Sequence, residues 1–185
     1  MSIIDQFRLD GRVAIVTGGN RGLGKEMARS LVEAGANVAV VSRKAAEAQA
    51  AADVYNGQAK GYGCDVTQPE QVDALVSQVI ADYGKIDILV NNAGINIRGP
   101  IEDLSLEEFQ QVMDINVNAI WLMCRAVAPH MKAAHYGRVI NIGSTLSIIT
   151  MPDRTPYATS KGAVLQLSRT LALEWATTGI TVNTV

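Results

Sequence analysis

Short runs of β-branched and aliphatic residues alternate along the chain with longer stretches whose apolar residues recur every three or four positions. The short runs predict buried strands, and the longer stretches predict helices with one apolar face. The expected strands span residues 12–16, 37–41, 59–63, 86–90, 138–142 and 180–183. The expected helices span residues 22–34, 44–54, 69–83, 105–134 and 156–178.

Local signals support several of these helix boundaries. Gly35 follows the first helix, where a glycine commonly ends one. Pro69 stands in the first turn of the third helix, where its missing N–H costs little. Ser105 is followed three residues later by Glu108, which is the pattern of a capping box.

Strands that are apolar on both faces and alternate with helices are typical of a parallel sheet covered on both sides. Right-handed crossovers make such a sheet doubly wound. We therefore expect an α/β fold of the Rossmann type, with helices on both faces, in a single domain over residues 1–185. The sequence ends within the sixth expected strand, so we expect a chain that is incomplete at its C-terminus.

Composition narrows the function classes. The 185 residues are 48% hydrophobic and 18% charged, against about 25% charged in an average globular chain, which argues against disorder. Sixteen Lys and Arg against eighteen Asp and Glu leave no basic excess for nucleic acid. Cys64 and Cys124 are far apart, so neither a disulfide framework nor a metal site is expected. No apolar run is long enough for a membrane span, and residues 1–12 lack an apolar signal core, so we expect a cytoplasmic protein.

The loop after the first strand, Thr17-Gly-Gly-Asn-Arg-Gly-Leu-Gly24, has the chemistry of a phosphate site. Glycine permits positive φ and close approach of backbone N–H groups to a ligand. The start of the following helix adds its dipole and its unpaired N–H groups. The loop therefore predicts binding of a pyrophosphate, and the alternative is a purely structural strand-to-helix turn.

Three glycine-loop patterns compete for this segment. The pattern G-x-G-x-x-G, started at Gly22, fails because Met27 stands where glycine or alanine is needed. The nucleotide-hydrolase pattern nearly fits from Gly19, but Glu26 stands where a hydroxyl should hold magnesium. The third pattern, T-G-x-x-x-G-x-G, fits throughout, and in it the chain resembles the short-chain dehydrogenase/reductase family.

Further motifs carry the resemblance along the whole chain. Cys64-Asp65-Val66 resembles the acidic turn after the third strand, in which Asp65 would contact the adenine. Residues 91–94, Asn-Asn-Ala-Gly, resemble the family segment that steadies the sheet beside the cofactor. Four residues fall at the positions of the family's catalytic tetrad: Asn116, Ser144, Tyr157 and Lys161.

The resemblance implies an NAD(P)-dependent oxidoreductase that acts on CH–OH donors. It implies cofactor contacts at Gly18, Asn20, Arg21, Gly22, Leu23, Gly24, Ser42, Arg43, Asp65, Val66, Asn92, Ala93, Gly94, Tyr157 and Lys161. Family members usually continue for several dozen residues with a substrate lid and a last strand, which this sequence lacks. In the family, the helices expected at 105–134 and 156–178 form subunit contacts, so a homodimer or homotetramer is expected.

Tyr157 and Lys161 are four positions apart, which places them on one helix face about 5–6 Å apart at Cβ. A tyrosine hydroxyl with a pKa near 10 supplies little phenolate at neutral pH, and a neighbouring ammonium should lower that pKa. In the family mechanism Tyr157 is the general acid in carbonyl reduction and the base in alcohol oxidation, and Lys161 also binds the nicotinamide ribose. The alternative for an isolated Y-x-x-x-K is an exposed pair on a helix surface.

Ser144 and Asn116 have less specific signals. Ser144 follows the fifth strand, and its hydroxyl can donate to the reacting oxygen or merely cap a turn. Asn116 lies inside a long helix, where asparagine is a poor helix former. The resemblance implies that it opens a local distortion and holds a water in the proton relay to Lys161, whereas Asn118 is expected to be an ordinary solvated asparagine.

Cofactor and substrate preferences follow from charge. The second strand ends in Val41-Ser-Arg-Lys44 without the carboxylate that favours NAD(H). Arg43 and Arg21 would attract a 2′-phosphate, so we predict NADP(H), with NAD(H) as the alternative. Arg98 and Arg154 could hold a carboxylate, a pattern that resembles sugar-acid dehydrogenases such as gluconate 5-dehydrogenase. The family's 3-oxoacyl thioester reductases share most of these motifs, so a small-molecule substrate of either kind remains open.

Two other function classes remain as alternatives: a nucleotide hydrolase that uses residues 19–25, and a non-catalytic dinucleotide-binding or oligomerisation module. His130 and His135 lie near a helix end, where histidine suits the dipole, and no metal role is expected for them. Residues 121–123, Trp-Leu-Met, are expected to serve packing.

Overall fold

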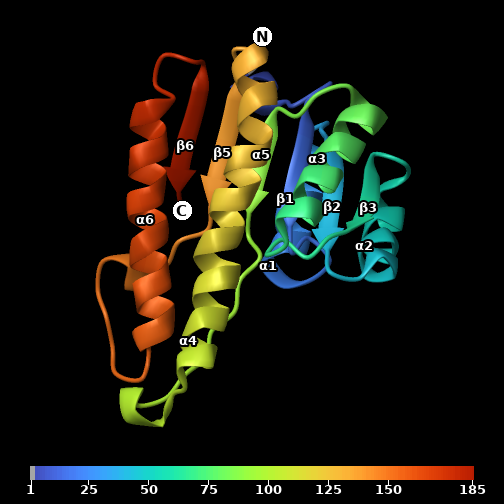
Figure 1. Ribbon diagram of the computed structural model, residues 1–185. Helices are drawn as coiled ribbons and strands as arrows, with labels where there is room; N and C mark the ends of the chain where they lie inside the picture. Colours follow the sequence, from blue (N-terminus) through green and yellow to red (C-terminus); the bar gives the residue numbers. More distant parts are fainter. Residues whose placement is uncertain (1–2) are drawn as a thin grey trace.

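The computed structural model describes residues 3–185. Six parallel strands form one sheet in the order β3-β2-β1-β4-β5-β6 (Figure 1). The strands are β1 (Val13–Thr17), β2 (Asn37–Ser42), β3 (Ala59–Gly63), β4 (Ile88–Asn91), β5 (Gly137–Asn141) and β6 (Ile180–Thr184). The chain reverses direction across the sheet between β1 and β4, the place where ligands bind in folds of this kind.

Helices cover both faces of the sheet, which confirms the doubly wound α/β architecture. They are α1 (Gly22–Glu33), α2 (Ala45–Ala52), α3 (Pro69–Tyr83), α4 (Leu106–Met113), α5 (Ala119–Ala133) and α6 (Thr155–Glu174). A π-helical turn, η4 (Asp114–Asn118), joins α4 to α5. Short 3₁₀ turns are η1 (Ile3–Phe7), η2 (Asp53–Tyr55), η3 (Ile101–Asp103) and η5 (Thr145–Ser147).

Two hydrophobic clusters flank the sheet. Val13 and Ile15 of β1 pack in the cluster that contains residues of α3, α5 and α6. Figure 1 shows these three helices on the near face of the sheet. Ala14 and Val16, the alternate positions of the same strand, pack in the cluster with α1 and α2. Alternate side chains of a strand point to opposite faces, so a strand covered on both sides must be apolar throughout.

The helix boundaries differ from the expected ones by more than two residues in two places. The helix expected over residues 156–178 ends at Glu174. Trp175 is buried, and its carbonyl oxygen accepts hydrogen bonds from the backbone N (2.9 Å) and hydroxyl (2.7 Å) of Thr178, which close a turn instead. The helix expected over 105–134 is interrupted by η4, although the Ser105–Glu108 capping box at its start is confirmed.

A charged cluster ties β1 to β4 at the amino end of the sheet. Asp87 is 5% exposed and accepts hydrogen bonds from Arg12 Nη1 (2.8 Å) and from the backbone N of Val13 (2.9 Å). Lys85 Nζ lies 3.0 Å from the same carboxylate. The Arg12 guanidinium in turn lies 3.8 Å from the ring centre of Tyr136, just before β5. This cluster stabilises the end of the sheet opposite the glycine loop.

A buried polar chain crosses from the sheet to α6. Asn91 Nδ2 donates to Asn141 Oδ1 at 2.8 Å, and Asn141 Nδ2 donates to Ser168 Oγ at 2.9 Å. The Ser168 hydroxyl donates to the Val164 carbonyl at 2.8 Å. All three polar side chains are at most 3% exposed, so each has found a partner inside the core.

None of the helices described over residues 3–185 has the length and apolar character needed to cross a bilayer.

Candidate active site

The glycine loop between β1 and α1 is fixed to the end of β4. Gly18 and Gly22 adopt φ of +64° and +55°, conformations that favour glycine. The buried Thr17 hydroxyl accepts hydrogen bonds from the backbone N of Asn92 (3.0 Å) and Ala93 (3.1 Å). The Asn92 side chain donates back to the carbonyl oxygens of Thr17 (3.0 Å) and Gly18 (3.2 Å). These four bonds hold the loop rigidly at the carboxyl edge of the sheet.

The first turn of α1 has backbone N–H groups available for a ligand. Arg21 is the N-cap residue, and its side chain makes no capping hydrogen bond. The first N–H groups of a helix lack intrahelical partners and carry partial positive charge. In this chain they face the pocket beside the loop, because Gly22, Leu23 and Gly24 all line it.

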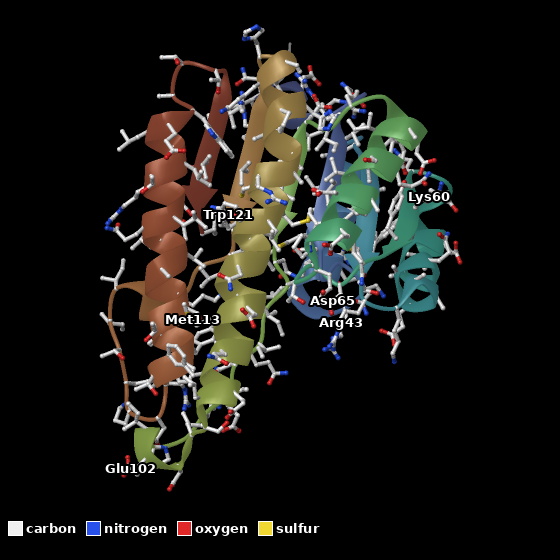
Figure 2. The ribbon with its side chains drawn as sticks, viewed as in Figure 1. Arg43, Lys60, Asp65, Glu102, Met113 and Trp121 are labelled. Atoms are coloured by element: carbon white, nitrogen blue, oxygen red, sulfur yellow. The ribbon has the colours of Figure 1, made fainter. Side chains whose placement is uncertain are left out.

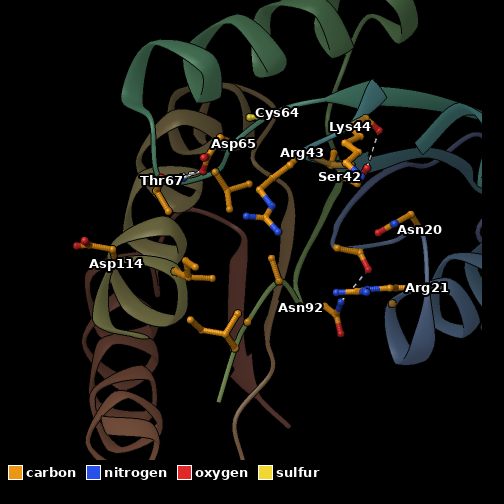
Figure 3. Close-up of a pocket in the computed structure, with 18 of the residues that line it drawn as sticks. Asn20, Arg21, Ser42, Arg43, Lys44, Cys64, Asp65, Thr67, Asn92 and Asp114 are labelled. Carbon is orange, nitrogen blue, oxygen red and sulfur yellow. Dashed lines mark hydrogen bonds between the residues drawn. The ribbon is translucent and has the colours of Figure 1, made fainter. Parts of the chain in front are cut away.

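The pocket beside this loop has a volume of about 920 Å³. Every cofactor contact expected from the sequence lines it except Tyr157 and Lys161. The lining residues come from the carboxyl ends of β1, β2 and β4, from the turn after β3, and from α2, α4 and η4. Figure 3 shows Asp114 of η4 on one side of the pocket and Arg21 of the glycine loop on the other. Figure 2 shows Arg43 and Asp65 at the same end of the sheet. The loops therefore meet as the parallel topology requires.

In the acidic turn after β3, one carboxylate oxygen of Asp65 makes hydrogen bonds within the turn. Asp65 Oδ1 accepts from the backbone N (3.0 Å) and the hydroxyl (2.7 Å) of Thr67. Val66 is buried beside it. Asp65 thus lines the pocket with one oxygen fixed in the turn.

The end of the pocket nearest β2 carries cations and one carboxylate that the sequence prediction missed. Arg43 extends into the pocket (Figure 3), and Arg21 lies across from it on the glycine loop. Glu47 also lines the pocket: its Oε1 lies 2.9 Å from Lys44 Nζ, and its Oε2 accepts from Asn20 Nδ2 at 3.2 Å. The spacing of positions 44 and 47 predicts an ion pair between them, but it does not predict that the pair lies in the pocket.

The neighbouring cations favour the ionised form of Glu47. The hydrogen bond and charge of Lys44 lower the pKa of the Glu47 carboxyl, and Arg21 and Arg43 add to the effect.

Tyr157 and Lys161 lie together on α6, and the lysine is not an exposed surface residue. Lys161 is 5% exposed, and its Nζ donates to the carbonyl of Ile142, directly after β5, at 2.5 Å. Its Nζ is 5.6 Å from the centre of the half-buried Tyr157 ring. Burial lowers the pKa of Lys161 to about 8. The exposed-pair alternative is therefore wrong for this lysine.

Asn116 lies in the π-helical turn, so the predicted local distortion is confirmed. Its fully buried amide exchanges hydrogen bonds with the backbone of Ile95: Oδ1 accepts from N (2.8 Å) and Nδ2 donates to O (2.9 Å). Nδ2 also donates to Ser160 Oγ at 3.0 Å, and that hydroxyl donates to the Tyr157 carbonyl at 2.7 Å. A chain of bonds thus joins the pocket wall at Ile95 to the tyrosine turn. Asn118 is exposed, as predicted for it.

Ser144 lies at the carboxyl end of β5, on the segment that packs against α6. Its Oγ accepts from the backbone N of Leu146 at 3.1 Å, and its own N donates to Ser147 Oγ at 3.2 Å. The hydroxyl thus caps η5 and retains its proton for donation to another acceptor.

The family model described as short chain dehydrogenase matches residues 12–185. This chain belongs to the short-chain dehydrogenase family. It is accordingly an oxidoreductase of the alcohol dehydrogenase type, and the nucleotide-hydrolase alternative is wrong.

Similar dehydrogenases and reductases match nearly the whole chain. It is 37% identical to a D-threitol dehydrogenase of Mycolicibacterium smegmatis, a match that covers 100% of this chain and 72% of the relative. It is 37% identical to a 3-oxoacyl-(acyl-carrier-protein) reductase of Vibrio cholerae, over 97% of this chain and 73% of that one. A crystal structure of a gluconate 5-dehydrogenase from Burkholderia cenocepacia, in complex with NADP and tartrate, aligns with a TM-score of 0.95 and 38% identity, covering 99% of this chain and 73% of its own.

The two arginines considered for an anionic substrate lie on loops that touch in this short-chain dehydrogenase. The backbone N of Gly99 donates to the Asp153 carbonyl at 3.3 Å, which joins the loop after β4 to the loop before α6. Arg98 is exposed. Arg154 is partly buried and donates to the same Asp153 carbonyl at 2.9 Å.

The residues of α5 differ in one respect from the packing role predicted for them. Leu122 and Met123 are buried, as predicted, but Trp121 is 48% exposed, so the prediction is wrong for it. Its ring lies 5.2 Å from the Arg125 guanidinium. Trp121 lines a second cavity of about 290 Å³ between α5 and α6, together with Trp175. The face of α5 that carries Leu122 and Met123 packs in the core, and the neighbouring face that carries Trp121 is exposed to solvent.

Proposed function

We propose that this protein transfers a hydride between NADP(H) and a secondary alcohol or its ketone, with Tyr157 as the general acid and base. The observation that carries the proposal is the buried Lys161 ammonium, 5.6 Å from the Tyr157 ring and held at the end of β5. An ammonium favours the ionised form of a neighbouring phenol, which is the state needed to accept a proton from an alcohol.

The residues present fit a nicotinamide dinucleotide. The uncapped start of α1 and the clamped glycine loop offer N–H groups to a pyrophosphate, and Arg21 and Arg43 offer charge to a 2′-phosphate. A dinucleotide supplies the hydride donor or acceptor when it is bound. Ile95, on the pocket wall, is hydrogen-bonded to Asn116, and Asn116 is linked through Ser160 to the tyrosine turn.

Each of the four tetrad residues has a separate role in this proposal. Tyr157 passes the proton to or from the substrate oxygen, and Ser144 donates a hydrogen bond to that oxygen as charge develops on it. Lys161 supplies the positive charge beside the phenol. Asn116 fixes the π-helical turn and, with a water, serves the proton relay to Lys161.

The central test follows the absorbance of NADPH in the presence of a panel of ketones. The wild-type chain should oxidise NADPH, and Tyr157→Phe should abolish turnover while NADPH still binds in a calorimetric titration. Turnover by the variant at the wild-type rate would refute the assignment. Tighter binding of NADH than of NADPH by the wild type would refute the cofactor preference.

For the substrate we propose a sugar acid or polyol, with a 3-oxoacyl thioester as the alternative. The proposal is supported by Arg98 and Arg154 on the two touching loops and by relatives that act on threitol and gluconate. Arg98→Ala should raise KM for sugar acids and leave KM for uncharged polyols unchanged. An unchanged KM for sugar acids would remove Arg98 from the site.

We also propose that the chain associates into a homodimer or homotetramer through α5 and α6. The exposed Trp121 and the cavity between these helices support the proposal, since aromatic residues are enriched in interfaces. Trp121→Glu should lower the mass measured by light scattering to that of a single chain. A wild-type chain that is already monomeric would refute the proposal.

A further inference from the structure

Four charged side chains meet where the glycine loop approaches the start of α2. Arg21, Arg43 and Lys44 are cationic, and Glu47 is the anion among them; all four line the 920 Å³ pocket. The two carboxylate oxygens of Glu47 contact different residues. Oε1 lies 2.9 Å from Lys44 Nζ on its own helix, and Oε2 accepts from Asn20 Nδ2, on the glycine loop, at 3.2 Å.

Glu47 differs from the other three acidic residues that line this pocket. Asp65 accepts from Thr67, Asp114 accepts from Asn118, and Glu107 lies in the first turn of α4. Among the ion pairs found over residues 3–185, the Lys44–Glu47 pair is the one formed between two residues of the pocket lining. Glu47 therefore determines how much of the positive charge at this end of the pocket is available to a ligand.

The bond to Asn20 sets this pair apart from an ordinary ion pair on a helix surface. An ion pair at positions i and i+3 of an exposed helix contributes little and has no necessary link to a ligand site. Here the same carboxylate also joins α2 to the loop that would hold the pyrophosphate. A ligand phosphate placed among these cations must compete with that carboxylate for Lys44 and for the two arginines.

We propose that Glu47 is a specificity-determining residue that lowers the preference of this pocket for NADP(H) over NAD(H). The inference rests on the proposed function, because it presumes that a nicotinamide dinucleotide occupies the pocket. Glu47 acts in two ways: it pairs with Lys44, and it places a negative charge beside the group that would receive the extra phosphate. The two arginines favour the 2′-phosphate, and Glu47 opposes them, so the wild-type chain binds both dinucleotides.

The test is Glu47→Gln, which keeps the length and the carbonyl acceptor of the side chain and removes its charge. Glu33→Gln is the matched control, since Glu33 is an exposed glutamate on α1 that pairs with Arg29 and does not line the pocket. Calorimetric titrations of each chain with NADPH and NADH give the ratio of the two dissociation constants. Titrations with 2′,5′-ADP and 5′-ADP isolate the contribution of the 2′-phosphate.

Removing one like charge from a solvated site should raise the selectivity for NADPH about five- to tenfold, mainly through tighter NADPH binding. The gain should shrink at 1 M salt, because charges exposed to solvent are screened there. The control should keep the wild-type ratio, and 2′,5′-ADP should repeat the gain seen with NADPH.

Two results would overturn the inference. One is a selectivity of Glu47→Gln within twofold of the wild type; the other is weaker NADH binding with NADPH unchanged, which would make Glu47 a ligand of the ribose. Wild-type protein that binds neither dinucleotide would overturn the proposed function and this inference together. If the wild type binds NADPH but Glu47→Gln has the same ratio of NADPH and NADH dissociation constants as the wild type, only the role of Glu47 is overturned.

Discussion

Gly24 lies where the first turn of α1 meets the glycine loop, and a side chain has no room there. A Cβ at this position would be 2.2 Å from the Gly18 carbonyl oxygen and 2.5 Å from Asn92 Nδ2. Non-bonded heavy atoms settle about 3.5 Å apart, so Gly24→Ala must displace the loop or the helix by roughly 1 Å. Neither neighbour is the free end of a flexible side chain, because Asn92 is bonded to both Thr17 and Gly18.

The size of the effect follows from these contacts. Displacement breaks the two hydrogen bonds of the Asn92 amide, each worth about 1 kcal/mol net, and adds about 1–3 kcal/mol of overpacking strain. Alanine returns up to about 1 kcal/mol of helix propensity. The free energy of unfolding should therefore fall by roughly 2–4 kcal/mol, and NADPH binding should weaken because the first-turn N–H groups of α1 move.

Urea unfolding followed by circular dichroism measures the loss of stability, and calorimetric titration measures NADPH binding. Gly162→Ala is the matched control, because a Cβ at this position would have no heavy atom within 4 Å apart from its chain neighbours and the backbone of α6 itself. The control should be unchanged or more stable by up to about 1 kcal/mol. The reasoning is wrong, and the clamped loop is not rigid, if two results are found together. These are a free energy of unfolding of Gly24→Ala within about 0.5 kcal/mol of the wild-type value and an unchanged affinity for NADPH.

Asp87→Asn should lower the free energy of unfolding by about 1–3 kcal/mol at pH 7, because three donors lose an ionised acceptor. Burial by itself would raise the pKa of Asp87, but its hydrogen bonds outweigh that effect and lower it. In urea titrations the difference from wild type should therefore begin to shrink as pH falls below about 4, and it should be lost below the folded-state pKa. Lys161 is charged in the unfolded chain and has a folded pKa of about 8, so wild-type stability should rise relative to Lys161→Met as pH increases from about 8 to 10.5; a constant difference would contradict this. Ser160→Ala should lower kcat about tenfold with KM unchanged, because the Ser160 hydroxyl bridges the π-helical turn and the first turn of α6. The control Ser168→Ala removes a similarly buried hydroxyl from α6 and should lower stability alone. Equal kcat values for the two serine variants would contradict the bridging role.

Much of the fold follows from periodicity because the sheet is buried on both sides. A strand covered by helices on each face must be apolar throughout, which made β1, β2 and β4 predictable within two residues at either end. β3, at the edge of the sheet, has the predicted bounds 59–63 although Lys60 and Gly63 are exposed. The pocket was predictable for a related reason. Parallel strands end at one edge, so the glycine loop, Asp65 and Asn92 had to meet there.

Features that depend on contacts between distant segments were not predictable. The end of α6 depends on the burial of Trp175 against the core, which local propensity does not encode. Trp121 is apolar, yet its face of α5 meets no other described element closely enough to cover it. Glu47 was missed because its place in the pocket depends on how α2 lies against the glycine loop, a relation set by packing on the sheet.

The buried amides of Asn91 and Asn141 face each other because β4 and β5 pair these two residues directly. Sliding one strand past the other by a single position would turn one amide toward the opposite helix layer and strand its partner among aliphatic side chains. A mispaired sheet would thus leave the buried amides of Asn91 and Asn141 without each other as partners, and Ser168 would lose the donor that Asn141 supplies. The buried hydrogen bonds of Asn91 and Asn141 therefore favour the native register of β4 and β5 over a shifted one. Variants that lack these amides should misfold or aggregate more often, even where their native state still forms.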